Sequence, residues 1–254
     1  MKKPACFLAQ TQSPALQCAL GYLVYPYATR PSSNRPCFQT MNWKYLRFFP
    51  SLDTRASQIA RTPLNGSLLD LGSSDGETLN HITELRPDLR LHSSDKFGSP
   101  EKYPTACDFR RIDFSTDKFP WPNGSMDVIT CMHVIEHLDS LTNLLAEITR
   151  LLKPGGFVYF ETPHPKTLNL PSASGKFTLN FHDDPTHVRV VTMGQLAAQL
   201  ANTSLRLEKT GVSRNWLFAA AHPLLCLLPE SRQRYTAHVH WIGWSAYLVA
   251  RQTT

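Results

Sequence analysis

The clearest chemistry in this chain lies in residues 68–78, which read LLDLGSSDGET. Gly72, Ser74 and Gly76 fit the Gly-x-Ser-x-Gly turn that exposes a nucleophilic serine in α/β-hydrolases. The same residues fit a loop of small residues that lets a nucleotide approach the backbone closely, with Ser74 in place of a middle glycine. The segment on its own therefore allows covalent serine catalysis or nucleotide binding.

The serine interpretation needs several strands ahead of the nucleophile and an oxyanion loop of the His-Gly-Gly type. Only 73 residues precede Ser74, and they show neither feature. The ten histidines of the chain make the choice of a triad partner almost free. We therefore interpret the serine match as accidental and keep a hydrolase that uses Ser74 as the lesser alternative.

Asp95 supports the nucleotide interpretation, because it ends the second expected strand of the chain. A carboxylate at that place can accept hydrogen bonds from both hydroxyls of a ribose. A dinucleotide loop would need glycines where this chain has Ser74 and Glu77, and no Gly-Lys-Ser/Thr phosphate loop occurs anywhere. The glycine pattern therefore argues against a nicotinamide enzyme.

Short apolar strands alternate with amphipathic helices from Ser67 onward, a pattern that places loops and acids together at one edge of a sheet. The expected strands are 67–72, 89–95, 109–114, 126–134, 157–163, 205–212 and 238–252, and the expected helices are 76–85, 139–156 and 192–204. We predict an α/β fold with a doubly wound, Rossmann-like, mostly parallel sheet. Helices cover both faces, and an antiparallel strand forms the C-terminal edge.

Three further segments carry structural expectations. Residues 41–49 are expected to begin a helix, and Thr192 and Gln195 stand at the spacing of a capping box. Residues 216–229 are strongly apolar but too short to span a bilayer. We expect them to be buried as an ordinary helix under the C-terminal strands, and docking of a substrate or of a membrane surface is the alternative.

The 254 residues suffice for one α/β domain with its own core. The net charge of +6 is uneven, since residues 1–61 hold eight Lys/Arg against one acid and residues 62–254 hold 18 against 19. The basic excess belongs to the N-terminal segment, which argues against a nucleic-acid-binding face on the domain. The six cysteines lack the spacing of a metal site and favour a reduced, cytoplasmic protein.

The same charge and proline pattern suggests how the chain is divided. We predict a basic, proline-containing extension over residues 1–40 and a domain over residues 41–254, with Met41 as the hypothesised start of the functional unit. Within the domain, residues 164–191 form an irregular stretch that is too long for a plain connection. We interpret it as an insertion on the substrate side.

Several ordered blocks between residues 65 and 210 resemble the class I S-adenosylmethionine-dependent methyltransferases, in particular the small bacterial-type members. The first block, LLDLGSSDGE, is similar to the family's Asp-x-Gly-x-Gly-x-Gly loop. The second is RIDFSTDKFPWPNGSMDVI, and the third runs from MDVITCMHVIEHLDS through a Lys-Pro-Gly-Gly turn to FVYFETP. The resemblance implies S-adenosylmethionine as the cofactor and methyl transfer as the activity.

The resemblance also implies the residues that hold the cofactor. They are Asp70, Gly72, Ser74 and Gly76 around the methionine part, Asp95 at the ribose, Asp113 and Phe114 at the adenine, and Met132 and His133 facing the cofactor. Ser74 departs from the family pattern, which has a glycine at this position. Its side chain must therefore point away from the ligand.

Methyl transfer from a sulfonium is an in-line displacement with an activated cofactor, so the protein mainly aligns the acceptor. An acceptor hydroxyl that keeps its proton needs a general base. We predict His137, after the fourth strand, or His187, in the DPTHVR stretch, for that role; a helix-capping His137 is the structural alternative. DPTHVR resembles bacterial methyltransferases of glycan or lipid modification, which implies a small-molecule, sugar or lipid-linked acceptor.

A metal site and two other functions were weighed against this interpretation. His133, Glu136, His137 and His187 offer the donors of a divalent-metal site, similar to that of small-RNA 3′-end methyltransferases. One acid expected there is His133 in this chain, so we predict no metal. The alternatives are a non-catalytic member that acts through protein partners, for which Ser74 is the only support, and the serine hydrolase.

Overall fold

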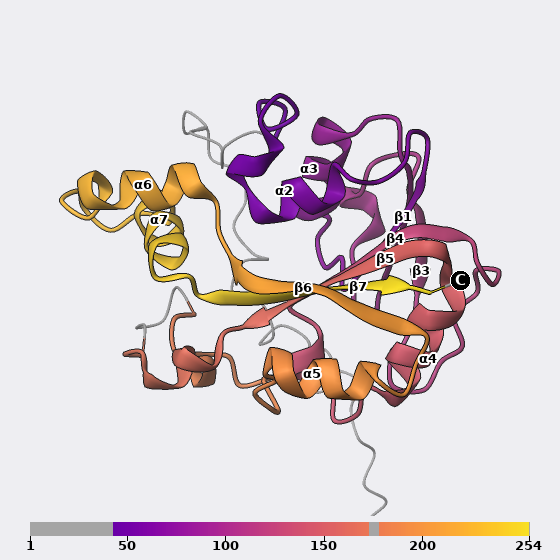
Figure 1. The fold of residues 1–254 in the computed structure, drawn as a ribbon. Coiled ribbons are helices and arrows are strands. Elements are labelled where there is room, and N and C mark those ends of the chain that lie inside the picture. The colour runs from indigo at the N-terminus through magenta and orange to yellow at the C-terminus, as the bar shows by residue number, and fades with distance from the viewer. Residues whose placement is uncertain (1–42, 173–177, 254) are drawn as a thin grey trace, which may run out of the picture.

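The computed structural model describes residues 43–172 and 178–253 (Figure 1). The expected extension over residues 1–40 and the start at Met41 lie outside the described residues. The strands are β1 (Ser67–Leu71), β2 (Arg90–Asp95), β3 (Asp108–Arg111), β4 (Met126–Met132), β5 (Leu152–Pro163), β6 (Leu205–Ser213) and β7 (Ser245–Gln252). The α-helices are α2 (Thr54–Ile59), α3 (Glu77–Leu85), α4 (Thr142–Leu151), α5 (Met193–Leu200), α6 (Trp216–Leu225) and α7 (Arg232–Ile242). Single 3-10 turns cover Pro50–Leu52, Pro100–Lys102, Ile135–His137, Pro165–Asn169 and Phe181–Asp183.

The strands of the described residues form one seven-stranded sheet in the order β3-β2-β1-β4-β5-β7-β6. Strands β1 to β5 run parallel, whereas β7 lies antiparallel between β5 and β6. The chain moves outward from β1 to β3 and then crosses back to β4 and β5, so the sheet is doubly wound. The predicted α/β class, the mostly parallel sheet and antiparallel pairing at its C-terminal edge are confirmed; β6 forms that edge and pairs antiparallel with β7.

Apolar side chains on both faces of the sheet explain its two layers of helices. Helices α4 and α5 cover one face, and α2 and α3 cover the other (Figure 1). Leu68 and Leu69, successive residues of β1, belong to the two opposite cores. Leu79, Ile82 and Leu85 share the buried face of α3, as their spacing predicts.

Residues 238–242 are helical, which corrects the prediction of a single strand over residues 238–252. Helix α7 is capped by Ser231, whose side chain accepts a hydrogen bond from Arg234 N, and it ends at Gly243 in a left-handed conformation (φ 65°). These caps outweigh the alternation of apolar residues in HVHWIGW, so β7 begins only at Ser245. Helices α6 and α7 separate β6 from β7, so the two strands do not form a hairpin.

The apolar segment 216–229 is largely exposed, which corrects the prediction that the C-terminal strands bury it. Helix α6 buries only Ala219, while Leu224 is 74% and Leu227 81% exposed. The segment leaves the edge strand β6, beyond which no sheet can cover it, and it packs against α7 instead (Figure 1). No helix of the described residues is long and apolar enough to cross a membrane.

Residues 43–48 form turns, which corrects the expected start of a helix in this segment. Helix α2 begins later, at Thr54, because the Asp53 side chain accepts a hydrogen bond from Ala56 N and so caps it there. The predicted capping box of Thr192 and Gln195 is present at the start of α5. Apart from two 3-10 turns, the described part of residues 164–191 is irregular, as expected of an insertion.

Candidate active site

The carboxyl ends of β1 and β4 lie side by side at the point where the strand order reverses. Strand β1 pairs with β2 on one side and with β4 on the other. In open α/β sheets ligands bind in the crevice beyond such a switch point. All of the residues expected to hold the cofactor lie at or shortly after the carboxyl ends of β1, β2, β3 and β4, except Asp70, which lies within β1. The structure therefore brings them to one edge of the sheet, while their contacts with a cofactor stay a prediction.

The loop after β1 needs two of its glycines for space as well as for backbone conformation. Gly72 (φ 81°) and Gly76 (φ 79°) are both left-handed, a region that favours glycine. A side-chain carbon on Gly72 would lie 2.2 Å from Cγ2 of Val134, and one on Gly76 would lie 2.4 Å from Cδ1 of Tyr103. The glycines therefore let the loop pack directly against these two side chains.

Ser74, in place of the middle glycine, also has a left-handed backbone (φ 48°). A residue with a side chain adopts this conformation at a cost of roughly 1–2 kcal/mol, so neighbouring groups must hold it. Its N–H donates to Oδ2 of Asp95 (2.9 Å), and its carbonyl accepts from the Tyr103 hydroxyl (2.7 Å). Asp95 also accepts from Phe97 N through Oδ1 (2.7 Å). Asp95 therefore fixes the loop, besides its expected contact with the ribose.

The Ser74 hydroxyl has no hydrogen bond to a histidine in the described part of the chain, so no base is in place to activate it. We expect Ser74→Ala to change cofactor affinity by less than about threefold, because backbone groups make the contacts that fix the loop. Calorimetric titration measures this effect. Labelling of the wild-type serine, but not of the variant, by a serine-reactive phosphonate would support the hydrolase alternative instead.

Asp70 is the buried acid of the loop, with 2% of its surface exposed. Its Oδ1 accepts a hydrogen bond from Oγ1 of Thr130 on the neighbouring β4 (2.7 Å). Burial raises the pKa of this carboxyl to about 7 despite the bond from Thr130. Asp70 therefore titrates near neutral pH, where an ammonium group bound beside it would favour the ionised form.

At the expected adenine end, Asp113 is already paired. Lys96 Nζ lies 2.6 Å from its Oδ2, and Oδ1 accepts from Ser115 N (3.0 Å). The hydrogen bond from Lys96, assisted by the one from Ser115, lowers the pKa of Asp113. A cofactor amino group at this carboxylate would therefore share it with Lys96.

The two aromatic residues near the adenine end differ in exposure. Phe114, expected beside the ring, is 7% exposed and packs on Phe119 with ring centroids 5.8 Å apart. Phe97, by contrast, is 73% exposed and follows Asp95 by two residues. Sequence reasoning missed Phe97, although an exposed aromatic residue two positions after the expected ribose acid is a visible signal.

A buried chain of charges follows the ends of β4 and β5. Arg55 on α2 donates to both carboxylate oxygens of Glu161 on β5 (2.5 and 2.9 Å). The two ring nitrogens of His133 lie 3.2 Å from Glu161 and 3.1 Å from Glu136. The Tyr159 hydroxyl also donates to Glu161 (2.5 Å). Sequence reasoning missed Arg55 and Glu161, because they are 106 residues apart and no motif joins them.

The charges in this chain set the protonation of its members. Burial would raise the pKa of Glu161, but Arg55 and His133 hold it well below its usual range. Burial would lower the pKa of His133, but hydrogen bonds to Glu136 and Glu161 outweigh it and raise the pKa to about 9. His133 is therefore an imidazolium at neutral pH and cannot serve as a base there. Met132, the other residue expected to face the cofactor, is partly buried against the core on the α2 side.

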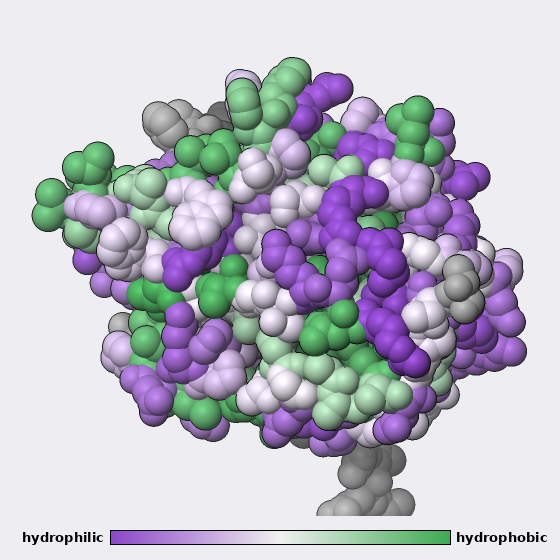
Figure 2. Space-filling model, viewed as in Figure 1, coloured by the Kyte–Doolittle hydropathy of each residue, from purple (hydrophilic) through white to green (hydrophobic). Residues whose placement is uncertain are grey.

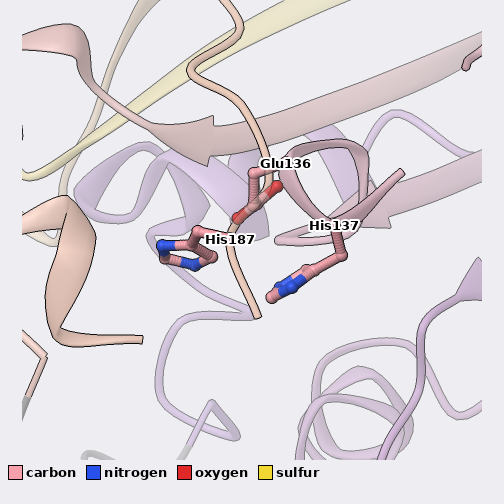
Figure 3. A group of neighbouring side chains, drawn as sticks. All are labelled: Glu136, His137 and His187. Carbon is pink, nitrogen blue, oxygen red and sulfur yellow. The ribbon is translucent and has the colours of Figure 1, made fainter. Parts of the chain in front are cut away.

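Glu136, His137 and His187 form a compact group, shown in Figure 3, in which one ligand atom from each lies within 4.8 Å of the others. Glu136 and His137 belong to the 3-10 turn after β4, and His187 comes from the irregular stretch. The ring centroids of the two histidines are 4.9 Å apart, and Val188 N donates to the Glu136 carbonyl (3.0 Å). The structure thus brings together the two histidines predicted as bases.

A backbone carbonyl fixes the tautomer of His187, and both histidines have a carbonyl near Nδ1. Nδ1 of His187 lies 2.7 Å from Phe181 O, and Nδ1 of His137 lies 3.1 Å from Thr186 O. A carbonyl oxygen only accepts, so Nδ1 of His187 carries a proton and its Nε2, when the ring is neutral, has a free lone pair. Nδ1 of His137 also lies 2.9 Å from the Thr186 hydroxyl, which can donate or accept. Burial lowers the pKa of His187 and so favours its neutral form. Its Nε2 can therefore accept a proton or bind a metal.

The charges around this group argue against a divalent metal. The Glu136 carboxylate already accepts from Thr162 Oγ1 (3.0 Å) and lies 3.1 Å from His133, so a metal would face an imidazolium at close range. We expect treatment with EDTA to leave cofactor affinity unchanged, and Mn²⁺ titration of the treated protein to give no saturable heat. Saturable Mn²⁺ binding that is lost in His187→Ala would contradict the predicted absence of a metal.

A cavity of about 220 Å³ opens beside His133. Arg55, His133 and Glu161 give it a charged side, and Val239 of α7 and Trp244 give it an apolar one. The volume exceeds that of several water molecules and suits a ring-sized group. His133 therefore joins the expected cofactor edge to a cavity that can hold a second molecule.

The strand order, the glycine loop after β1 and the acid after β2 define a class I S-adenosylmethionine-dependent methyltransferase fold. Residues 42–210 match the family model described as a methyltransferase domain. Because this match covers more than half of the chain, the protein belongs to that methyltransferase domain family.

Known proteins similar to this chain agree with the family. A ubiquinone biosynthesis O-methyltransferase of Albidiferax ferrireducens is 32% identical over 91 residues, which cover 34% of this chain and 36% of the relative. The chain therefore matches only about a third of that relative's length. Among solved structures, a S-adenosylmethionine-dependent methyltransferase from Mesorhizobium loti superposes with a TM-score of 0.55 at 18% identity, covering 81% of this chain and 98% of the other.

A second solved structure shows which ligands a protein of this fold can hold. The geranyl diphosphate C-methyltransferase of Streptomyces coelicolor superposes with a TM-score of 0.53 at 12% identity, over 78% of this chain and 73% of the other. Its structure contains Mg²⁺, geranyl-S-thiolodiphosphate and S-adenosylhomocysteine. At this identity the likeness shows a shared fold.

Proposed function

We propose that this protein transfers a methyl group from S-adenosylmethionine to a hydroxyl of a small-molecule, sugar or lipid-linked acceptor. The position of His133 supports this most, because it follows β4 at the cofactor edge and also lines the 220 Å³ cavity. A cofactor bound over the ends of β1 and β4 would then have its reactive end next to a space for the acceptor. Membership of the methyltransferase domain family agrees with this arrangement.

Among these acceptors, the cavity favours a hydroxyl carried by an aromatic or other apolar compound. Its wall from Val239 and Trp244 is apolar, while Arg55 and Glu161 offer charged partners on the other side. A ring with a hydroxyl group matches both sides. The matched relative is named as an O-methyltransferase of ubiquinone biosynthesis, which is consistent with oxygen as the methyl acceptor.

The cofactor supplies a methyl group that its sulfonium already activates. The protein must align the acceptor oxygen, exclude water and accept the hydroxyl proton. We propose Nε2 of His187 as the proton acceptor, with His137 as the second candidate, because burial lowers the pKa of His187 and Phe181 O holds its Nδ1–H. Neither histidine lines the 220 Å³ cavity, so an acceptor that uses either base would extend from the cavity past His133 and Glu136. Once an acceptor is found, His187→Ala should lower kcat and leave cofactor affinity unchanged.

Calorimetric titration with S-adenosylmethionine and S-adenosylhomocysteine tests the proposed cofactor. We expect micromolar binding that Asp95→Ala weakens by about 100-fold or more, because a charged acceptor of two ribose hydroxyls is lost together with the bond to Ser74 N. Asp127→Ala is the matched control. Asp127 also accepts a hydrogen bond from a backbone N–H, that of Ser67 (2.8 Å), but it lies near the amino end of β4, away from the carboxyl ends of the strands. We expect the control to bind as the wild type does.

Absence of binding in the wild-type protein would contradict methyl transfer and favour the non-catalytic alternative. Equal weakening in the Asp95 and Asp127 variants would show that the effect comes from general destabilisation and not from a lost ribose contact. Nucleic acid has no part in the proposal, since residues 62–254 carry 18 Lys/Arg against 19 acids.

A further inference from the structure

Helix α6 presents large apolar residues to solvent. Within the helix, Trp216, Leu217, Ala220, Pro223 and Leu224 are exposed, and at 100° per residue they fall on one face of roughly 120°. The same stripe continues through the turn after the helix at residues 227 and 228, where both leucines are exposed. A surface helix of a soluble domain normally shows the opposite pattern, with its apolar stripe facing the core.

The inner face of α6 holds the one polar side chain of the helix, His222, beside Phe218 and Ala219. His222 lies against α7, with its Nε2 3.4 Å from Nδ1 of His238 and its ring centroid 5.6 Å from that of Trp241. Phe218 stacks on His240, which also belongs to α7, with ring centroids 6.0 Å apart. Packing against α7 therefore fixes α6 in the orientation that turns the leucines outward.

A second apolar group stands beside the start of α6. Tyr45, Phe48 and Phe49 are between 65% and 71% exposed. Their segment leads to Asp53, which forms a β-bridge with Asn215, the residue before α6. Figure 2 shows apolar side chains gathered at the outer end of α6 on the left and at the top, where the segment before α2 lies. We call the two groups together the apolar face.

Positive charges border the apolar face. Residues 43–49 and 214–242 contain five Lys/Arg (Lys44, Arg47, Arg214, Arg232 and Arg234) and one acid, Glu230. Arg232 also pairs with Glu77 of α3 (2.7 Å), so the border with this acid carries a net charge of +3. The Arg214 guanidinium lies 5.7 Å from the centre of the Trp216 ring, and that of Arg47 lies 5.6 Å from the centre of the Phe48 ring. Cations and aromatic rings around exposed leucines are the pattern of helices that lie in the interface of an anionic membrane.

We propose that the apolar face docks this protein on the surface of an anionic phospholipid bilayer. The leucines would enter the region between head groups and acyl chains, and the bordering arginines would contact lipid phosphates. The helix lies on the bilayer and does not cross it, since no described helix is long enough to span. The positive border favours an anionic bilayer over a second copy of this chain as the binding partner, because two copies of the same positive face would repel each other.

The docking face lies next to the cavity. Helix α7 packs on α6 and also lends Tyr235, Val239 and His240 to the lining of the 220 Å³ cavity. A lipid-linked acceptor could therefore reach the cavity from the bilayer without passing through water. This last step rests on the proposed methyl transfer, whereas docking itself does not.

Flotation with vesicles tests docking on the full-length protein. We expect the wild type to float with vesicles of 70% phosphatidylcholine and 30% phosphatidylglycerol, and at least tenfold less with phosphatidylcholine alone. Leu224→Ser/Leu227→Ser should reduce the bound fraction at least tenfold, because both leucines are more than 70% exposed. Leu64→Ser/Leu207→Ser is the matched control, with two exposed leucines outside the apolar face, and should bind as the wild type does.

A fluorescence measurement keeps the test independent of the folding of the double variant. Vesicles should shift the tryptophan emission of the wild type to shorter wavelength, and Trp216→Phe should lose most of that shift. Failure of the wild type to float would overturn docking, as would equal binding by both double variants. A concentration-dependent dimer that Leu224→Ser/Leu227→Ser abolishes, without vesicle binding, would assign the face to a second copy. Because cofactor titration needs no membrane, failure of docking and failure of methyl transfer are distinguishable.

Discussion

Replacement of Glu161 by glutamine is expected to lower the free energy of unfolding by about 3 kcal/mol, because it removes the fully buried acid of an ion pair whose Arg55 side chain is 30% exposed. Glu161 is fully buried and receives hydrogen bonds from Arg55 and Tyr159, and His133 lies 3.2 Å away. The amide keeps the shape but not the charge, so Arg55 and His133 would keep their positive charges without this compensating carboxylate. Their pKa values, which Glu161 helps to raise, should both fall.

Thermal unfolding of Glu161→Gln should show a Tm lower by on the order of 10 °C at pH 7. Glu208→Gln is the matched control, since Glu208 also pairs with two arginines, Arg61 and Arg251, but is partly exposed on β6. Its loss should cost less than about 1 kcal/mol, as surface pairs contribute little. Equal Tm values for the two variants would mean that the buried network does not stabilise the fold.

Asp70→Asn is expected to have opposite effects on stability and on cofactor binding. The folded pKa of Asp70 is about 7, above its ordinary value of 3.8, so between these pH values the unfolded chain releases the proton first. Stability from this group is therefore full below pH 4 and falls as the pH rises to 7. At 1.36 kcal/mol per pH unit, ionisation of Asp70 lowers the free energy of unfolding by at most about 4 kcal/mol. Asparagine does not ionise, so the variant avoids this loss. The variant should thus be more stable than the wild type at pH 8, with the gap narrowing at pH 5.

The same variant should bind S-adenosylmethionine at least about tenfold more weakly, because the ammonium group loses its ionic partner. Wild-type affinity should fall as the pH drops below 7 and Asp70 becomes protonated, approaching tenfold per pH unit. The variant should show no such dependence between pH 5.5 and 7.5. Calorimetric titrations at several pH values measure the affinity of both proteins and its pH dependence. Equal pH dependence in the two proteins would contradict a contact between Asp70 and the cofactor.

Asp127→Asn is the control for the stability experiment, because it should change the stability at pH 8 in the opposite direction. Burial would raise the pKa of Asp127, but hydrogen bonds from Lys153 and Ser67 outweigh it and lower the pKa. Ionised Asp127 therefore stabilises the fold above its ordinary pKa, and this contribution is lost as the pH falls. Its asparagine variant should be less stable than the wild type at pH 8, where Asp70→Asn is more stable.

The sequence alone determined the strands that bear the cofactor loop. Residues 67–71 and 126–132 are mostly apolar, a pattern typical of strands buried between two layers of helices. Gly72, Gly76 and Asp95 follow such strands at fixed spacings, and the carboxyl ends of parallel strands meet at one edge. This local information sufficed to predict the α/β class and to expect Gly72, Gly76 and Asp95 at one edge of the sheet.

Only the tertiary structure decided which groups meet across long separations. No local pattern joins Arg55 to Glu161 or His137 to His187, because contacts between distant elements depend on how α2 and the irregular stretch return to the sheet. The exposure of 216–229 was also beyond the sequence, since an apolar helix is buried or exposed according to what the fold places beside it. Here it follows an edge strand and packs on α7, so its leucines face outward.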